Sequence, residues 1–134
     1  MRQIYWALFL LLLLSSCVLK KEPTAPTLNF KSGVGYIPEG SSVDTNALIK
    51  IGLEAQKTSS DMRYLQIERR IDSNTDVLFS SVLTAASKTS FDKDFECRTA
   101  VSKTIHTEQY FFKISDDNGF TFEKNMTLKV DPEL

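Results

Sequence analysis

Residues 108–130 read EQYFFKISDDNGFTFEKNMTLKV, and this stretch decides the fold. Apolar residues alternate with polar ones before position 115 and again after position 125, as they do in strands with one buried face. The turn sequence DDNG at residues 116–119 separates the two runs, and its Asn-Gly pair tolerates the positive φ of a tight hairpin. We therefore predict a β-hairpin, in which Gly119 has a structural role.

Four further segments are candidates for strands, at residues 46–56, 62–71, 75–83 and 88–99. In the first segment, Ile49 and Leu53 fall on one face, and the other face is mostly polar. In the second segment, Leu65 and Ile67 are core candidates, and Arg69 falls on the same inward side. This arginine either lies near the strand end and reaches water, or pairs with an acid.

The third segment is apolar without clean alternation, so it predicts a short strand or an irregular crossing segment. Outside residues 1–16 no window shows a helical period over helical length, and residues 85–87 form a helical turn at most. About seven strands, separated by turns every 8–12 residues or so, match an all-β, immunoglobulin-like antiparallel β-sandwich over residues 27–131.

The hairpin over residues 110–130 resembles the last hairpin of PKD-like and related immunoglobulin-like domains of bacterial surface proteins. The likeness lies in an aromatic residue, an alternating strand, the DDNG turn and a closing alternating strand. The chain departs from the PKD pattern because its only Trp, Trp6, lies outside the middle strands. The resemblance implies the fold class, and it implies a tyrosine corner at Tyr110, whose hydroxyl would bond the upstream backbone.

The first residues have the pattern of an export signal. Arg2 precedes the uncharged run at residues 4–14, which is too short to span a bilayer, since spanning takes about 20 apolar residues. The sequence Leu14-Ser15-Ser16-Cys17 follows directly, and it resembles the lipobox of bacterial lipoproteins. This resemblance implies a signal peptide over residues 1–16, cleaved before Cys17, and acyl chains on Cys17 that anchor the protein in a membrane.

The same resemblance implies a location. Val18 follows Cys17 where many lipoproteins retained at the inner membrane carry Asp, so the resemblance favours the outer membrane. Both sides of that membrane stay open, because Lys20-Lys21-Glu22 fits a surface-export signal and a solvated tether equally well. We interpret residues 17–26, with two prolines, as the lipidated N-terminus and an extended linker.

Composition narrows the classes of function. The 16 Lys and Arg residues nearly balance the 17 Asp and Glu residues, so a cationic surface for nucleic acid is not indicated. One His and two Cys leave little for metal or nucleophile chemistry, and we expect no cofactor. Once Cys17 is acylated, Cys97 has no partner for a disulfide, and its alternating neighbours predict a small buried side chain.

Two acidic groups raise the question of a metal. Asp92, Asp94 and Glu96 alternate on one strand face, which fits a solvated face better than a Ca²⁺ site, because Arg98 continues the row and neutralises it. The hairpin turn poses the same question with a second set, Asp116, Asp117 and Asn118. Turn chemistry explains that set without a metal.

We therefore favour a non-catalytic binding or structural domain that is anchored by lipid in the cell envelope. It would be accessory to a larger envelope complex or would bind a polysaccharide or an envelope protein, with Tyr64, Phe111 and Phe120 as candidate contacts. The alternative hypothesis is a small envelope hydrolase or metal-dependent enzyme that uses His106, predicted in a surface loop, together with the acidic row. A third, a soluble secreted inhibitor, applies if Cys17 carries no lipid.

Overall fold

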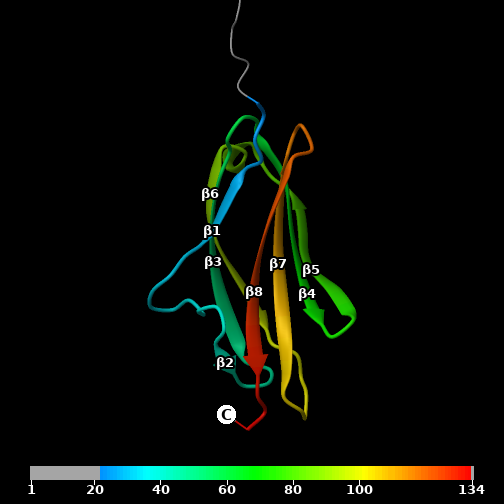
Figure 1. Cartoon of the computed structure of the whole chain (residues 1–134). Helices are drawn as coiled ribbons and strands as arrows, with labels where there is room; N and C mark the ends of the chain where they lie inside the picture. The colour runs from blue at the N-terminus through cyan, green and yellow to red at the C-terminus, as the bar shows by residue number, and fades with distance from the viewer. Residues whose placement is uncertain (1–21, 134) are drawn as a thin grey trace, which may run out of the picture.

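The computed structural model describes residues 22–133, which form two β-sheets packed face to face (Figure 1). The sheets have the strand orders β1-β3-β6 and β2-β8-β7-β4-β5. The elements are β1 Thr27–Phe30, β2 Ser42–Val43, β3 Leu48–Gln56, β4 Met62–Ile71, β5 Asn74–Val82, the 3-10 turn η1 Ala85–Ser87, β6 Ser90–Arg98, β7 His106–Asp116 and β8 Thr121–Val130. Within residues 22–133, no helix has the length and apolar character to cross a membrane. The predicted signal peptide and Cys17 lie outside these residues.

The strand order is that of an immunoglobulin-like domain. Strands β1, β3 and β6 take the places of strands A, B and E, and β8, β7, β4 and β5 take those of G, F, C and C′. The pairings are antiparallel apart from the two-residue contact of β2 with β8, which is parallel. The all-β sandwich predicted from alternation is confirmed. Residues 22–133 contain eight strands in place of about seven, and the irregular third segment is the strand β5.

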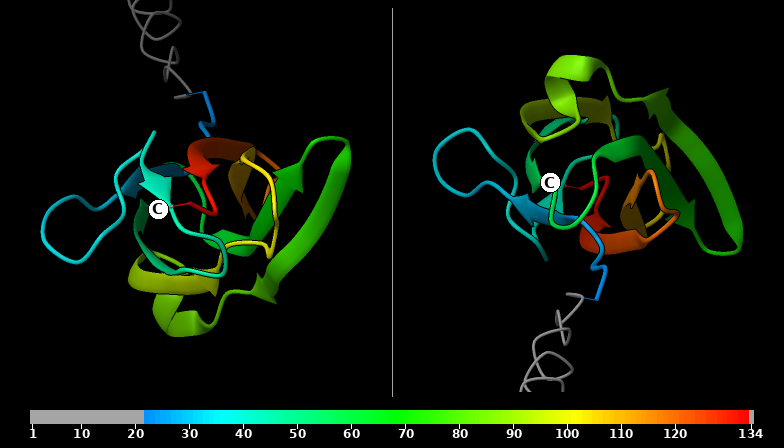
Figure 2. Two further views of the ribbon diagram at one scale, coloured as in Figure 1. Left: turned by 90° about the horizontal axis from the view of Figure 1, so that it is seen from below. Right: turned by 90° about the horizontal axis from the view of Figure 1, so that it is seen from above.

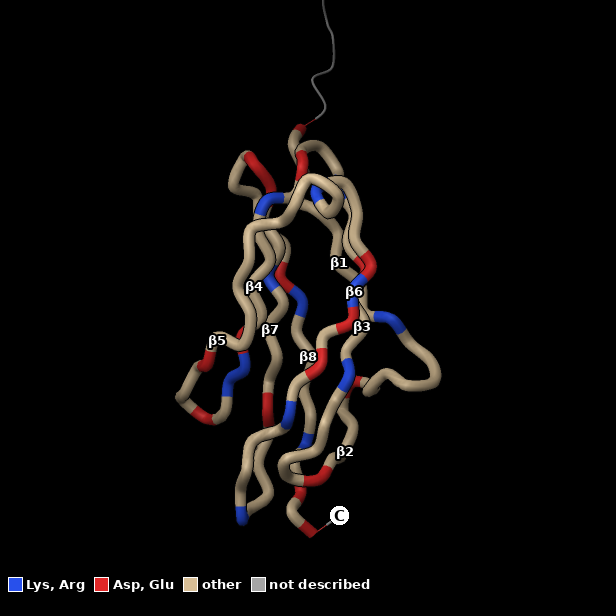
Figure 3. Tube along the Cα trace, turned by 180° about the vertical axis from the view of Figure 1, so that it is seen from behind, with Lys and Arg blue, Asp and Glu red and all other residues tan. Residues whose placement is uncertain are grey.

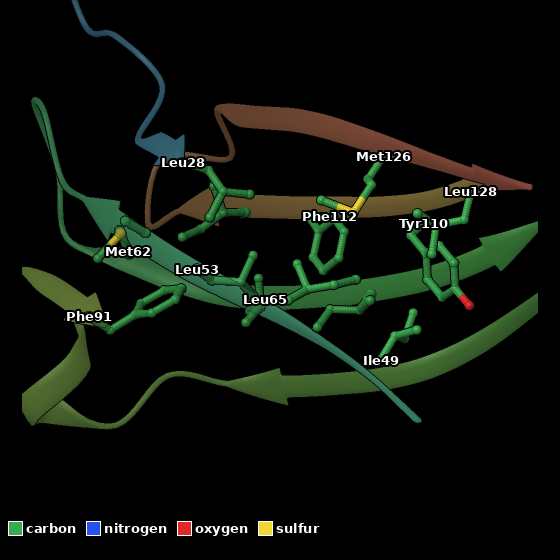
Figure 4. Close-up of a cluster of buried hydrophobic side chains, with 14 residues drawn as sticks. Leu28, Ile49, Leu53, Met62, Leu65, Phe91, Tyr110, Phe112, Met126 and Leu128 are labelled. Atoms are coloured by element: carbon green, nitrogen blue, oxygen red, sulfur yellow. The ribbon is translucent and has the colours of Figure 1, made fainter. Parts of the chain in front are cut away.

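Alternate residues of the two sheets fill the space between them (Figure 4). Phe112, on β7, is completely buried at the centre, and its ring meets those of Phe30 and Phe95 edge-on, with centroids 5.1 and 6.3 Å apart. The buried core cluster runs from Leu28 to Leu128 along the chain. A chain that begins at Val18 therefore contains the complete core, and we expect it to fold on its own.

Residues 24–26, which the sequence assigned to the linker, lie on the domain. The Thr58 hydroxyl donates to the carbonyl of Ala25 at 2.8 Å, and the Ser59 hydroxyl donates to that of Thr24 at 2.9 Å. Pro26 is fully buried. The linker is shorter than predicted because the β3–β4 turn binds the chain before β1 begins.

The segment between β1 and β2 closes one side of the sandwich. The amide of Lys31 donates to the carbonyl of Gly52 at 2.9 Å in the three-stranded sheet. The amide of Gly40 then donates to the carbonyl of Thr127 at 2.8 Å in the five-stranded sheet. This segment thus bonds to both sheets, and its middle part, cyan in Figure 2, projects away from the sandwich.

The opposite side has no such cover among the described residues. Strands β5 and β6 are each the last strand of their sheet, and the chain joins them only at one end, through η1. Strand β5 is exposed on both faces, and Val77, Phe79 and Val82 are 58%, 41% and 66% exposed. We call this side of the sandwich, bounded by β5 and β6, the open edge.

Candidate functional site

The outer face of the five-stranded sheet carries two of the three aromatic residues predicted to contact a ligand. Tyr64 on β4 and Phe111 on β7 are half-buried there, and the guanidinium of Arg70 lies 4.4 Å from the centroid of the Phe111 ring. Phe120 is 40% exposed and lies in the turn before β8. The structure therefore brings two of these residues to one face and does not form a single aromatic row.

Charged side chains separate Tyr64 from Phe111 on this face. The Lys113 ammonium lies 3.0 Å from the Glu68 carboxylate and 3.6 Å from that of Glu123. The amide of Gln66 donates to the same Glu68 carboxylate at 2.7 Å. The Glu68 carboxylate in these contacts is largely buried, and the contacts fix the positions of the side chains. The face presents ordered polar groups between two aromatic rings.

The carboxylate of Asp94, in the acidic row on β6, is surrounded by donors. It lies 2.9 Å from the Lys50 ammonium and 3.1 Å from that of Lys31, and the Tyr36 hydroxyl donates to it at 3.2 Å. These contacts, with that from Lys50 the strongest, hold the pKa of Asp94 at about 2, below its ordinary value of 3.8. Figure 3 shows acidic and basic positions alternating along this part of β6 and its neighbours.

Two details of the acidic row differ from the sequence analysis. Arg98 does not neutralise the row, because its guanidinium donates to the carbonyl of Asn46 at 2.8 Å. The two lysines take that place: Lys31 also pairs with Asp92, and Lys50 lies 3.9 Å from the Glu96 carboxylate. Within residues 22–133, no group of three or more His, Cys, Asp or Glu side chains is placed to hold a metal ion.

The acidic hairpin turn organises its own backbone. The Asp116 carboxylate is buried and accepts hydrogen bonds from the amides of Asn118 and Phe120, both at 2.9 Å. Gly119 has a φ of +84°, in the left-handed region that favours glycine. Asp117 is exposed at the tip of the turn. The turn thus uses its carboxylate to bind backbone amides.

His106 lies elsewhere than predicted, because it is the first residue of β7 and its side chain is only 11% exposed. One ring nitrogen, Nδ1, lies 3.2 Å from the carbonyl of Thr104, and the other, Nε2, lies 3.2 Å from the carboxylate of Glu108. Both nitrogens face acceptors of the protein itself. The Asp94 carboxylate bonds to Lys31 and Lys50 on the outer side of the other sheet, so the structure does not bring His106 to the acidic row.

Glu108 is a buried polar residue that the sequence analysis missed. Its carboxylate is fully buried and accepts hydrogen bonds from the amide of Ala100, at 2.6 Å, and from the hydroxyl of Tyr110. The tyrosine-corner expectation therefore needs correction, because the Tyr110 hydroxyl reaches the upstream backbone only through Glu108. Burial, together with this hydrogen bond, raises the pKa of Tyr110. The sequence does contain a signal for this burial. Glu108 alternates with Tyr110 and Phe112, so it falls on the inward side of the strand.

Arg69 and Cys97 complete this inner cluster. The guanidinium of Arg69 lies 3.2 Å from the carboxylate of Asp76, its partner across β4 and β5, so the alternative in which it pairs with an acid holds. It also donates to the carbonyl of Arg98 at 3.1 Å. Cys97 is half-buried, and burial raises the pKa of its thiol to about 11. The thiol is protonated at neutral pH, which makes it a poor nucleophile.

A groove with a volume of about 310 Å³ lies along the open edge. Its lining comes from β3, β4, β5, the η1 segment and β6: Leu53, Leu65, Ile67, Phe79, Ser81, Val82, Leu83, Thr84, Ser87, Phe91, Lys93, Asp94 and Phe95. We call it the β5–β6 groove. No local sequence pattern predicts this groove, because it forms between β5 and β6, which belong to different sheets.

No family model matches the chain, and no curated protein matches it. Among solved structures, the chain is similar to murine CRIg, with 12% identity, a TM-score of 0.43, and coverage of 78% of this chain and 95% of that one. It is similar, with the same identity and TM-score, to a chain in the complex of Zinc 2-glycoprotein and Prolactin inducible protein from human seminal plasma, covering 87% of this chain and 100% of that one. The assignment of the fold therefore rests on the strand order described above.

Proposed function

We propose that this chain is a lipid-anchored binding module of a bacterial cell envelope, held at the outer membrane by an acylated Cys17. The observation that carries the proposal is the sequence Leu14-Ser15-Ser16-Cys17 directly after an uncharged run, and the tether that it implies between Cys17 and the domain is short. Thr24 is bonded to Ser59 in the β3–β4 turn, and it follows Cys17 by only seven residues. At about 3.5 Å per residue, such a tether spans at most about 25 Å.

This tether would fix which end of the domain faces the membrane. The β3–β4 turn, η1 and the β7–β8 turn lie at the end where the N-terminal chain enters, and the C-terminus lies at the other end (Figure 1). The strands run from one end to the other. The outer face of the five-stranded sheet would then stand upright from the membrane, where another envelope component can reach it from the side.

The proposed mechanism is presentation of this face to a partner. Aromatic rings such as those of Tyr64 and Phe111 stack on sugar rings or pack against a protein, and the ordered side chains of Glu68 and Lys113 add hydrogen-bonding groups between them. An envelope protein and a polysaccharide both suit this chemistry, and a role as accessory to a larger envelope complex follows from either. Because both nitrogens of His106 face internal acceptors, the histidine supports a structural role.

Fractionation of cells that express the full chain tests the anchor. The wild-type protein and Cys97→Ser, the matched control, are expected in the outer-membrane fraction and are expected to incorporate labelled palmitate. Cys17→Ser should lose both properties, because the only acceptor for the lipid is gone. Outer-membrane Cys17→Ser protein in wild-type amounts would contradict the anchor.

Crosslinking in intact cells tests the binding face separately. A photoreactive amino acid at Phe111 should give an adduct with an envelope component. The same amino acid at Glu54, an exposed position on the three-stranded sheet, is the control and should not. Equal crosslinking at the two positions would contradict the assignment of the outer face.

A further inference from the structure

We propose that the β5–β6 groove binds a long-chain carboxylic acid, with the apolar chain along the groove and the carboxylate on the ammonium group of Lys93. The proposal concerns a small ligand at the open edge of the sandwich. It does not depend on lipidation of Cys17 or on the partner of the outer sheet face. Three properties of the groove carry it: the walls, the single cation and the size.

The walls of the groove are apolar and belong partly to the core. Leu53 and Leu65 line it from β3 and β4, although they are only 1% and 5% exposed. Phe79 and Val82 line it from β5, where they are 41% and 66% exposed. Figure 4 shows Leu53, Leu65 and Phe91 together near one end of the core. Leu53 and Leu65 are already shielded from water, so an apolar chain in the groove would mainly cover the exposed ring of Phe79. Removal of such apolar surface from water is the main driving force for this kind of binding.

Lys93 gives the groove a positive charge. It lies on the inward side of β6, opposite Leu53 in the register and between Phe91 and Phe95, where an apolar residue is expected. The ion pairs found within residues 22–133 do not include Lys93. Asp94 also borders the groove, but its carboxylate bonds to lysines on the outer side of the sheet. A cation among apolar walls is complementary to an anion that carries an apolar chain.

The size of the groove selects one slender chain. Its volume of about 310 Å³ is at the lower end of the range of roughly 300–1,000 Å³ found for ligand pockets. It follows the gap between two strands and opens to solvent along the side, so a chain can lie in it while a headgroup stays near water. One lysine suits one negative charge. Ser81, Thr84 and Ser87 also line the space, and the Ser81 hydroxyl already donates to the carbonyl of Val82 at 3.1 Å.

An inward lysine on an edge strand can also protect that edge from pairing with other chains, and this role predicts different results for Lys93→Met. If protection were its only role, Lys93→Met would associate through the open edge and would bind acids and alcohols as the wild type does. If Lys93 holds a carboxylate, the same variant loses its preference for the acid.

Titration of the chain that begins at Val18 with dodecanoate and dodecanol, which differ in charge and share a chain length, tests the proposal. The wild-type domain should bind dodecanoate roughly five- to ten-fold more tightly than dodecanol, as one charge-assisted contact in a half-exposed site provides. Lys93→Met should bind the two equally. Lys103→Met, which removes an exposed loop lysine, is the matched control and should behave as the wild type does.

Two further variants locate the ligand. Ser81→Trp places a large side chain in the groove and should weaken both probes at least ten-fold, because it occupies their space. Ser80→Trp changes the next residue, on the outer side of the same strand, and should leave both affinities within two-fold. If Ser81→Trp does not fold, NMR chemical-shift changes in the wild-type domain on addition of dodecanoate locate the ligand instead. These changes should centre on β5, β6 and Leu53.

Three results would overturn the proposal. The first is the absence of dodecanoate binding below the concentration at which it forms micelles. The second is a preference for the acid that survives in Lys93→Met, since the cation would then not hold the carboxylate. The third is a set of shift changes on the outer sheet face or at the end near the N-terminus, which would place the probe elsewhere.

Discussion

The two edges of the sandwich are built from the same kinds of strand and differ in what lies across them. On one edge, which we call the closed edge, the segment from Lys31 to Ser41 bonds first to β3 and then to β8, so it links the two sheets. On the open edge, β5 and β6 meet only through η1, and a groove of about 310 Å³ reaches residues of the core. In the immunoglobulin order, a further strand, D, would lie beside the strand equivalent to β6.

This difference separates stability from binding within one small domain. Backbone bonds and packing at the closed edge connect the two sheets, and a loss there should loosen both. Strand β5 contributes exposed apolar side chains and one bonded neighbour, β4, so a change there should cost little stability. The closed edge and the centre are therefore expected to be sensitive to mutation, and the open edge tolerant of it.

The largest expected effect comes from one substitution made in two places. Phe112→Ala removes a fully buried ring from the centre and should lower the free energy of unfolding by roughly 3–5 kcal/mol. Phe79→Ala, at the open edge, removes a ring that is 41% exposed and should cost roughly 1 kcal/mol. Urea denaturation of the two variants measures the difference. Equal losses would mean that β5 is as integral to the core as β7.

An intermediate effect is expected at the closed edge. A Cβ at Gly52 would lie 2.6 Å from Cε1 of Tyr36 and 2.7 Å from Cβ of Lys31, so Gly52→Ala must push the crossing segment away. We expect a loss of roughly 1–2 kcal/mol in the free energy of unfolding. Glu54→Ala, on the same strand and exposed, is the control and should stay within about 0.5 kcal/mol of the wild type. Control-like stability of Gly52→Ala would show that the segment moves without cost.

The smallest effect should appear in the pH dependence of stability. The pKa of Asp94 is about 2 in the folded protein, below its ordinary value of 3.8, so folding favours the carboxylate. Its contribution is fully present above about pH 3.8 and is lost as the pH falls towards 2. Asp94→Asn should therefore unfold at slightly lower urea than the wild type at pH 7, and the difference should shrink as the pH falls from about 3.8 towards 2. A difference that is constant over this range would show that the carboxylate charge is not involved.

Alternation along the chain predicted most of the sandwich, because burial of one face leaves a period of two in the sequence. The strand predicted over residues 62–71 has those bounds in the structure, and Leu65 and Ile67 lie in the core. Strand β5 gave no such signal. Both of its faces are exposed, and the pairing with β4 shifts by one residue near Leu78, which interrupts the alternation.

The candidate sites were less predictable, because they depend on segments far apart in the chain. Alternation along the strand predicted that Asp94 lies on the outer side of β6. It could not predict the contact with Lys31, which is 63 residues away and is brought there by the segment between β1 and β2. Lys93 lies on the inward side of β6, and it borders a groove because no strand within residues 22–133 covers that side of the sandwich. The burial of Glu108 could have been predicted from the sequence, since alternation places it on the same inward side as Tyr110.

The most direct test of the central claim, that this domain is held in the envelope by lipid at Cys17, is the mass of the intact protein extracted from bacterial membranes. The account predicts a chain that begins at Cys17 and carries a diacylglycerol on the thiol together with an acyl group on the new N-terminus. A chain that retains residues 1–16, or one that begins at another residue and carries no lipid, would contradict it.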